Sequence, residues 1–190
     1  MIAVHDREVA KRLRTLRQHA MDLSDLARHG AKDIVFEGYP ERGWNCRMTD
    51  LQAALGLHQL PHLDEWIDVR AAQWDRYDAL LRDLPLETPA PPQEGTRHAR
   101  HLYTILVRPD APRTRDEVLS FLNDRRIGTG VHYRGVHLHP YYRDEFGIRA
   151  EDLPVATDIS ERTLSLPFGP KVTEADQDDV VAALADALGG

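Results

Sequence analysis

A long amphipathic stripe between residues 61 and 84 constrains the fold of this chain more than any other feature. Its members recur in steps of four and three, and they are Leu63, Ile67, Arg70, Trp74, Tyr77, Leu81 and Leu84. This spacing predicts a helix of about six turns that begins at Pro61 and buries one face. Four prolines follow between residues 85 and 95, and they predict an extended linker at a subdomain boundary.

The residues beyond this linker predict a small α/β domain. Alternating or short apolar runs predict strands at 101–107, 127–133 and 164–166. Capping signals and helical spacing predict helices that begin at Thr114, around 140–146 and 154–162, and after Thr173. Strands and helices in this order are typical of a layered α/β (α+β) domain.

The residues before the long helix predict a different organisation. Ile2 to Val4 is a short apolar run that predicts a strand, and Asp6 is a good N-cap for a helix directly after it. Residues 23–44 lack periodicity and predict a long irregular loop. Thr49 and Gln52 form a predicted capping box for a helix that continues to about Leu60.

Composition limits the class of partner. The 190 residues are 42% hydrophobic and carry a net charge of -7, which argues against nucleic acid or an anionic membrane as a partner and favours a small molecule or a protein. The single cysteine, Cys46, cannot form an internal disulfide, and this favours a reducing, cytoplasmic compartment. No apolar run reaches the roughly 18 residues of a membrane span, and the first residues do not resemble a secretory signal.

The first candidate site lies between the irregular loop and the helix that follows it. Asn45 and Arg47 stand two residues apart near a predicted helix N-terminus, where an amide and a planar guanidinium suit a phosphate group. On spacing alone, a turn formed by Asn45 and an ion pair formed by Arg47 are the favoured interpretation, because phosphate loops are usually richer in glycine.

The second candidate site follows the predicted strand at 127–133. Three histidines, three tyrosines and two arginines lie between residues 131 and 143, and such side chains can bind sugar hydroxyls, rings and phosphates. A metal site formed by His132, His137 and His139 is a weaker alternative, because their spacing matches no known ligand motif.

The sequence offers little support for covalent catalysis by cysteine or lysine. Cys46 could act as a nucleophile with one of the ten histidines, but a lone cysteine is more often a small buried hydrophobe. The three lysines are Lys11, Lys32 and Lys171, and none has an apolar setting that would suit Schiff-base chemistry.

A family resemblance now adds to these patterns. The residues from Gly43 to Gly56 read GWNCRMTDLQAALG, and they closely resemble the signature G-[YF]-N-x-R-[ML]-[ST]-x-[LI]-Q-A-A-[LI]-G of the DegT/DnrJ family of nucleotide-sugar aminotransferases. Further family elements follow in order at His101–Tyr103, Ile127–Thr129, His132–Tyr133 and Leu164–Pro167. The resemblance therefore covers essentially the whole chain.

The resemblance implies the C-terminal part of the aspartate-aminotransferase fold. Residues 1–60 would be a remnant of the large cofactor-binding domain, and residues 61–190 would be a long linking helix and a small α/β sandwich domain. Asn45 and Arg47 would reach the pyridoxal phosphate of the neighbouring subunit in a homodimer. His132 and Tyr133, with His137, would line the nucleotide-sugar side, and glutamate would donate the amino group.

One departure from the family is large. The family's Schiff-base lysine would lie upstream of Met1, and covalent attachment of the cofactor is then not possible in this chain. We therefore expect the chain to have no transaminase activity alone and to contain no catalytic residue or metal site. The alternative is a stand-alone, non-catalytic partner of a full-length aminotransferase. In either case, the stretch before about Leu60 is expected to expose apolar side chains.

Overall fold

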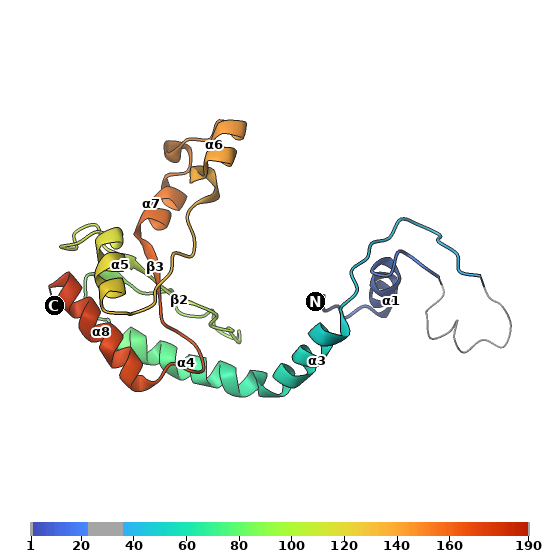
Figure 1. Cartoon of the computed structure of the whole chain (residues 1–190), viewed down its shortest axis with the longest axis horizontal. Helices are drawn as coiled ribbons and strands as arrows, with labels where there is room; N and C mark the ends of the chain where they lie inside the picture. The colour runs from blue at the N-terminus through green and yellow to red at the C-terminus, as the bar shows by residue number, and fades with distance from the viewer. Residues whose placement is uncertain (1, 23–35, 190) are drawn as a thin grey trace. The chain divides into compact units, whose positions relative to one another are not determined.

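The computed structural model describes residues 2–22 and 36–189 (Figure 1). The chain divides into two compact units, Met1–Pro61 and His62–Gly190. The division lies at the start of the long helix, so the subdomain boundary predicted in the proline-rich stretch is wrong. That stretch contributes a strand to the second unit because residues 86 and 87 pair with the middle strand of the sheet.

Local capping organises the first unit. Helix α1 (Arg7–Leu16) begins after Asp6, whose carboxylate accepts hydrogen bonds from the amides of Glu8 and Val9 at 2.8 and 3.0 Å. Helix α3 (Asp50–Gln59) begins with the predicted capping box of Thr49 and Gln52. The strand predicted at Ile2–Val4 does not form. Among the described residues it has no neighbouring strand, and a strand needs one to satisfy its backbone groups.

The long helix is shorter than its apolar stripe. A 3₁₀ turn, η1 (Leu60–His62), precedes helix α4 (Leu63–Leu80). The buried residues of α4 are Gln73, Trp74 and Tyr77, all in its second half, whereas Leu63 at its start is exposed. The stripe therefore marks a core-facing surface only in its C-terminal half.

A three-stranded antiparallel sheet forms the centre of the second unit. Its order is β1 (Leu86–Glu87), β2 (Tyr103–Val107) and β3 (Thr163–Leu166). The predicted strand at 127–133 is wrong, because only Gly130 pairs with the sheet, through an isolated bridge to Ser165. Glycine at positions 128 and 130 weakens the strand tendency of this segment.

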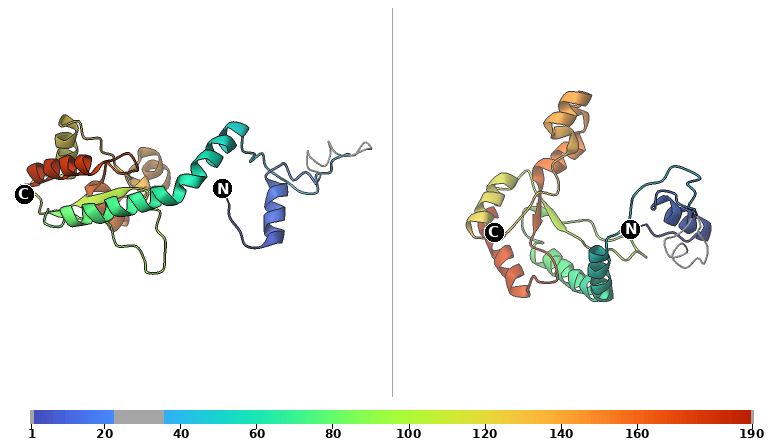
Figure 2. Two further views of the ribbon diagram at one scale, coloured as in Figure 1. Left: turned by 90° about the horizontal axis from the view of Figure 1, so that it is seen from below. Right: turned by 45° about the vertical axis from the view of Figure 1, so that its right-hand side comes forward.

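Helices cover this sheet and extend from it (Figures 1 and 2). They are α5 (Arg115–Asp124), η2 (Val136–Leu138), α6 (Pro140–Phe146), η3 (Ala150–Asp152), α7 (Pro154–Arg162) and α8 (Glu174–Leu188). Helices α5 and α8 begin with the capping boxes predicted at Thr114 and Thr173. Helices α4, α5 and α8 lie around the sheet, whereas α6 lies away from it, beyond α7.

Aromatic rings join α4 to the sheet. The ring of Tyr103 on β2 lies 4.9 Å, centroid to centroid, from the rings of both Trp74 and Tyr77. The Tyr103 hydroxyl donates a 2.5 Å hydrogen bond to Asp78. Burial, and then the neighbouring carboxylate of Asp78, raise the pKa of Tyr103 well above its ordinary value. Burial also raises the pKa of Tyr77 well above its ordinary value, so both tyrosines serve as neutral core residues.

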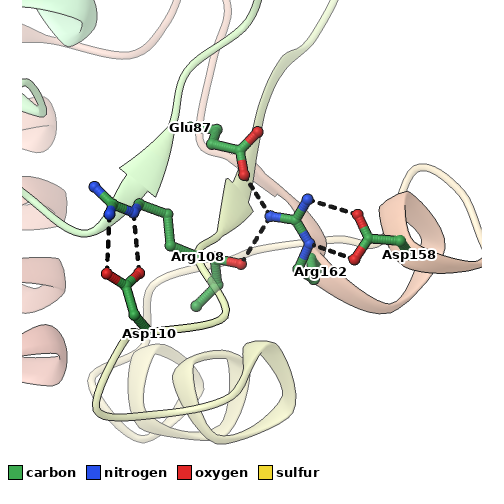
Figure 3. A network of polar contacts seen from close by, with 6 residues as sticks. Glu87, Arg108, Asp110, Asp158 and Arg162 are labelled. Carbon is green, nitrogen blue, oxygen red and sulfur yellow. Dashed lines mark hydrogen bonds and ion pairs between the residues drawn. The ribbon is translucent and has the colours of Figure 1, made fainter. Parts of the chain in front are cut away.

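Ion pairs join the end of α7 to the first two strands (Figure 3). The Arg162 guanidinium donates to both carboxylate oxygens of Asp158, at 2.9 and 2.6 Å, to Glu87 at 2.6 Å and to the Val107 carbonyl at 3.3 Å. The hydrogen bonds to Asp158 and Glu87 raise the pKa of Arg162 further, so it stays charged. This network ties the short strand β1 to α7.

Candidate functional site

The segment that contains Asn45 and Arg47 is held against the C-terminal end of α1. Trp44 donates its amide to Leu16 at 2.8 Å and accepts a bond from the His19 amide at 2.9 Å, and Cys46 donates to Arg17 at 2.9 Å. A Cβ atom at Gly43 would lie 2.1 Å from the Ala20 nitrogen, so only glycine allows this approach. Backbone contacts therefore fix the segment and leave its side chains available.

Asn45 and Arg47 are both exposed, and their side chains have no hydrogen-bond or ion-pair partner among residues 2–22 and 36–189. The ion pair that would have given Arg47 a purely structural part is not formed with any described residue. Two residues beyond Arg47, the Thr49 cap opens α3. An amide, a guanidinium and a helix N-terminus thus stand within a few residues, with donors unused.

An apolar hollow of about 600 Å³ lies beside the same segment. Its lining includes Trp44, Cys46 and Met48, together with Leu13 and Leu16 of α1, and the arginines Arg14 and Arg17 also border it. Asn45 and Arg47 do not line it, and successive side chains of an extended segment point to opposite sides. The alternating residues therefore separate an apolar side from a polar side that carries the two candidate ligands.

His132 lies in the second unit, on the segment that bridges to β3. Its Nδ1 atom is 2.8 Å from the Ser165 hydroxyl oxygen. A Cβ atom at Gly130 would lie 2.9 Å from the ring, so this glycine makes room for the imidazole. Tyr133 follows across a cis peptide bond, contacts the His132 ring edge-on at 4.8 Å, and is 73% exposed.

His137 has a different environment from His132. It is only 6% exposed, and its Nε2 atom is 2.8 Å from the Thr157 hydroxyl, which in turn donates to the Ala150 carbonyl at 2.9 Å. These contacts give His137 a structural part in joining η2, η3 and α7. Its contact with substrate stays a prediction.

The two predicted groups of site residues lie in different units. Asn45 and Arg47 belong to the first, whereas His132, Tyr133 and His137 belong to the second. No described group of three or more His, Cys, Asp or Glu residues is arranged to hold a metal ion, so the geometry gives no support to the metal alternative of His132, His137 and His139. Cys46 is exposed and has a free thiol.

Three hydroxyl side chains that hold the 130–137 segment were not predicted from the sequence. They are Thr157 and Ser160 on α7 and Ser165 on β3. A serine or threonine is common in any helix or strand, so the sequence contains no signal that separates these from other hydroxyls. Strand β3 shows no alternation of buried and exposed residues, because all four are buried, so its pattern does not single out Ser165 either.

Gln73, a buried polar residue of α4, was also not predicted from the sequence. Its side-chain nitrogen donates to the carbonyls of Gly169 and Val172 at 3.0 and 2.6 Å, and its oxygen accepts from the Gly169 amide at 3.2 Å. A polar residue flanked by the apolar stripe was the available signal. Gln73 fixes the loop between β3 and α8.

Comparison with protein families gives a match over nearly the whole chain. A sequence model of the DegT/DnrJ/EryC1/StrS aminotransferase family matches residues 1–185. The spore coat polysaccharide biosynthesis protein SpsC of Bacillus subtilis (strain 168) is 39% identical, over 100% of this chain and 49% of its own length.

Solved structures show the same fold. Spr1654 from Streptococcus pneumoniae, a putative sugar aminotransferase in its PMP-form, superimposes with a TM-score of 0.84 at 24% identity, over 98% of this chain and 46% of that one. DesV from S. venezuelae, solved in complex with a ketimine intermediate, gives a TM-score of 0.80 at 30% identity, over 97% and 45%. The chain spans about half the length of the relatives it matches.

Proposed function

The chain belongs to the DegT/DnrJ/EryC1/StrS aminotransferase family, and we propose that it forms the C-terminal portion of a sugar aminotransferase that uses pyridoxal phosphate. The proposed reaction transfers an amino group, with glutamate as the donor, to a keto sugar linked to a nucleotide. The observation that carries the proposal is the pair of unpartnered side chains, Asn45 and Arg47, within the family's sequence signature.

The residues present fit the phosphate of the cofactor. Arg47 offers a guanidinium fork and Asn45 an amide, and neither has another partner among the described residues. Charge-assisted bonds from arginine to phosphate are among the stronger hydrogen bonds in proteins. Spr1654, which has the same fold, has been solved in a PLP-form. We propose that Asn45 and Arg47 hold the phosphate of a cofactor bound by the neighbouring subunit of a homodimer.

Pyridoxal phosphate, when bound, supplies an electron sink for chemistry at the carbon that carries the amino group. This chain would supply binding and orientation. His132 and Tyr133 would contact the sugar nucleotide, since one is a half-buried hydrogen-bonding ring and the other is an exposed aromatic ring. His137 is proposed to support this segment more than to touch the ligand.

No described lysine suits covalent attachment of the cofactor. Lys11 is exposed on α1, and Lys171 is exposed on the loop after β3. Lys32 lies outside the described residues. A lysine becomes a good nucleophile when it is desolvated in an apolar pocket. Lys11 is exposed, and Lys171 is an exposed member of an open hollow whose lining also carries the carboxylates of Asp176, Asp179 and Asp186. We therefore propose that the attaching lysine belongs to another stretch of polypeptide.

A reconstitution experiment tests the proposal. The chain is assayed with glutamate, pyridoxal phosphate and a nucleotide-linked keto sugar, alone and after mixing with a polypeptide that corresponds to the other half of SpsC. We expect no turnover by the chain alone and measurable turnover by the mixture. Turnover by the chain alone would refute the assignment of the lysine to another segment.

Arg47→Ala provides the residue-level test in the reconstituted enzyme. Loss of a charge-assisted phosphate contact of about 1.5–3 kcal/mol should weaken cofactor binding by roughly 10- to 150-fold. Arg42→Ala is the matched control, because Arg42 is an exposed arginine on the same segment. Equal effects of the two substitutions would argue against a specific phosphate contact at Arg47.

If the mixture stays inactive but the chain binds a full-length relative, the non-catalytic partner becomes the better hypothesis.

A further inference from the structure

Three hydroxyl groups form hydrogen bonds with the segment between Gly130 and His137. The Ser165 hydroxyl is hydrogen-bonded to His132, and the Thr157 hydroxyl is hydrogen-bonded to His137. The Ser160 hydroxyl accepts a 2.7 Å hydrogen bond from the Gly135 amide. Ser165 and Ser160 are buried, and Thr157 is partly buried. Each hydroxyl therefore bonds to one position of the segment.

The direction of the bond at His137 follows from the second contact of Thr157. The Thr157 hydroxyl donates its only hydrogen to the Ala150 carbonyl at 2.9 Å. Its oxygen must then accept a hydrogen from Nε2 of His137. The Nε2 hydrogen of His137 is thus already bonded within the protein, and the ring is buried.

The direction of the bond at His132 follows from the absence of any second contact. Among the described residues, the buried Ser165 hydroxyl has no other acceptor than Nδ1 of His132 at 2.8 Å. An orphaned buried donor is costly and rarer than an under-used acceptor. The serine therefore donates its hydrogen to Nδ1. The neutral imidazole must then carry its own hydrogen on Nε2.

His132 and His137 carry the hydrogen on the same ring nitrogen but differ in whether it is available. Nε2 of His137 is bonded to Thr157, whereas Nε2 of His132 has no partner among the described residues. The His132 ring is also half-buried rather than buried. Of the two, only His132 can present a hydrogen-bond donor to a ligand.

We propose that Ser165 is a positioning residue that fixes His132 as the Nε2–H tautomer, so that His132 donates a hydrogen bond to an acceptor oxygen of the ligand. Identification of that ligand as a sugar nucleotide rests on the proposed function. The tautomer itself depends only on contacts within the second unit. Ser165 on β3 would thus contribute to the recognition of substrate through His132 and not by touching the ligand.

Nitrogen NMR of the histidine rings in the full 190-residue chain tests the tautomer directly. At about pH 8, above the ordinary histidine pKa of roughly 6.5, neutral rings show which nitrogen carries the hydrogen. The spectrum of His132→Gln assigns the His132 signals by their disappearance. We expect His132 to be predominantly the Nε2–H form. A predominantly Nδ1–H ring would overturn the proposal.

Ser165→Ala and Ser165→Thr separate positioning from support of the fold. The alanine variant should relax His132 from a single Nε2–H form to the tautomer mixture of a free neutral imidazole, in which Nε2–H still predominates, and the threonine variant, which keeps a hydroxyl, should restore the single form. Ser160→Ala is the matched control, because it removes a buried hydroxyl that holds the same segment without touching a histidine. An unchanged single form in Ser165→Ala, or an equal loss of it in Ser160→Ala, would contradict the proposal.

Titration with uridine diphosphate glucose, after the chain is mixed with the polypeptide that corresponds to the other half of SpsC, separates this proposal from the proposed function. Movement of the His132 Nε2 signal in the wild-type chain, with weaker movement in Ser165→Ala, supports both. A fixed Nε2–H tautomer that no sugar nucleotide perturbs would leave the positioning part of Ser165 intact and would count against the sugar-nucleotide site. Equal movement in both chains would overturn the link between Ser165 and ligand binding.

Discussion

The two units of this chain differ in how they use their apolar residues. The second unit buries a continuous core that draws on α4, all three strands, α5 and α8. In the first unit, Ala20 is the only buried hydrophobic residue among those described. Most of its described large apolar side chains are exposed instead, and they are Ile2, Val4, Val9, Phe36, Tyr39, Trp44, Met48, Leu51, Leu55, Leu57 and Leu60.

This contrast shows that well-formed helices are not the same as a stable unit. Helices α1 and α3 have good caps, but each cap contributes only about 1 kcal/mol, and most helix stability in proteins comes from packing of an apolar face. An exposed apolar surface of this kind marks an interaction site. We therefore propose that the first unit contacts further protein, whereas the second provides its own core.

The largest expected effect comes from a matched pair of leucine substitutions. Leu184→Ala removes a fully buried side chain of α8 and should lower the free energy of unfolding by about 2–5 kcal/mol. Leu55→Ala changes a side chain of α3 that is 59% exposed and should stay within about 0.5 kcal/mol. Chemical denaturation measures both, and a comparable loss in Leu55→Ala would show that α3 has its own core contacts.

The next effect concerns the buried hydrogen bonds between the Gln73 side chain and the backbone of Gly169 and Val172. Gln73→Met keeps the shape of the side chain but leaves the backbone groups of Gly169 and Val172 without their partner. We expect a loss of about 1–3 kcal/mol in the free energy of unfolding. Gln93→Met, at an exposed position in the same unit, is the control. If the two variants have the same free energy of unfolding, water can replace the hydrogen bonds of Gln73.

Helix caps provide a smaller test that compares the units directly. Thr173→Ala removes the N-cap of α8 and should cost about 1 kcal/mol in the unfolding of the second unit. Thr49→Ala removes the equivalent cap of α3, so it should lower the helical circular-dichroism signal without moving that transition. Thr173→Ser should retain most of the stability. A shift of the transition in Thr49→Ala would show that the units unfold together.

The smallest effect is the response to acid. Bonds from the Thr114 amide and the Thr173 hydroxyl lower the pKa of Glu117 and Asp176, and the bond from Arg162 lowers the pKa of Asp158. A lowered carboxyl pKa stabilises the folded state above the unfolded pKa, and this contribution disappears as the pH falls through the folded value.

The pH dependence should therefore appear in the second unit. The contribution of these three carboxylates to its denaturation midpoint should be complete above the ordinary carboxyl values of 4.5 for glutamate and 3.8 for aspartate and should be lost below them. Asp158→Asn should reduce the slope of this acid transition. A midpoint that rises as the pH falls would contradict the sign of all three shifts.

Local signals in the sequence were sufficient for most helices and for the family. The capping boxes at Thr49, Thr114 and Thr173 each open a helix in the structure, because a cap is decided within four residues. The signature from Gly43 to Gly56 identified the family that the comparison confirms. It also predicted Asn45 and Arg47 as the phosphate contacts, and these stay a prediction.

Tertiary structure alone decided the pairing of segments that are distant in sequence. The proline-rich stretch supplies β1, and residues 127–133 meet the sheet only at Gly130, because a strand forms only where a partner offers its backbone groups. The separate environments of His132 and His137 have the same origin. The sequence determined which side chains were present, and the fold determined which hydroxyl each histidine meets, since hydrogen-bond direction depends on neighbours that no local pattern specifies.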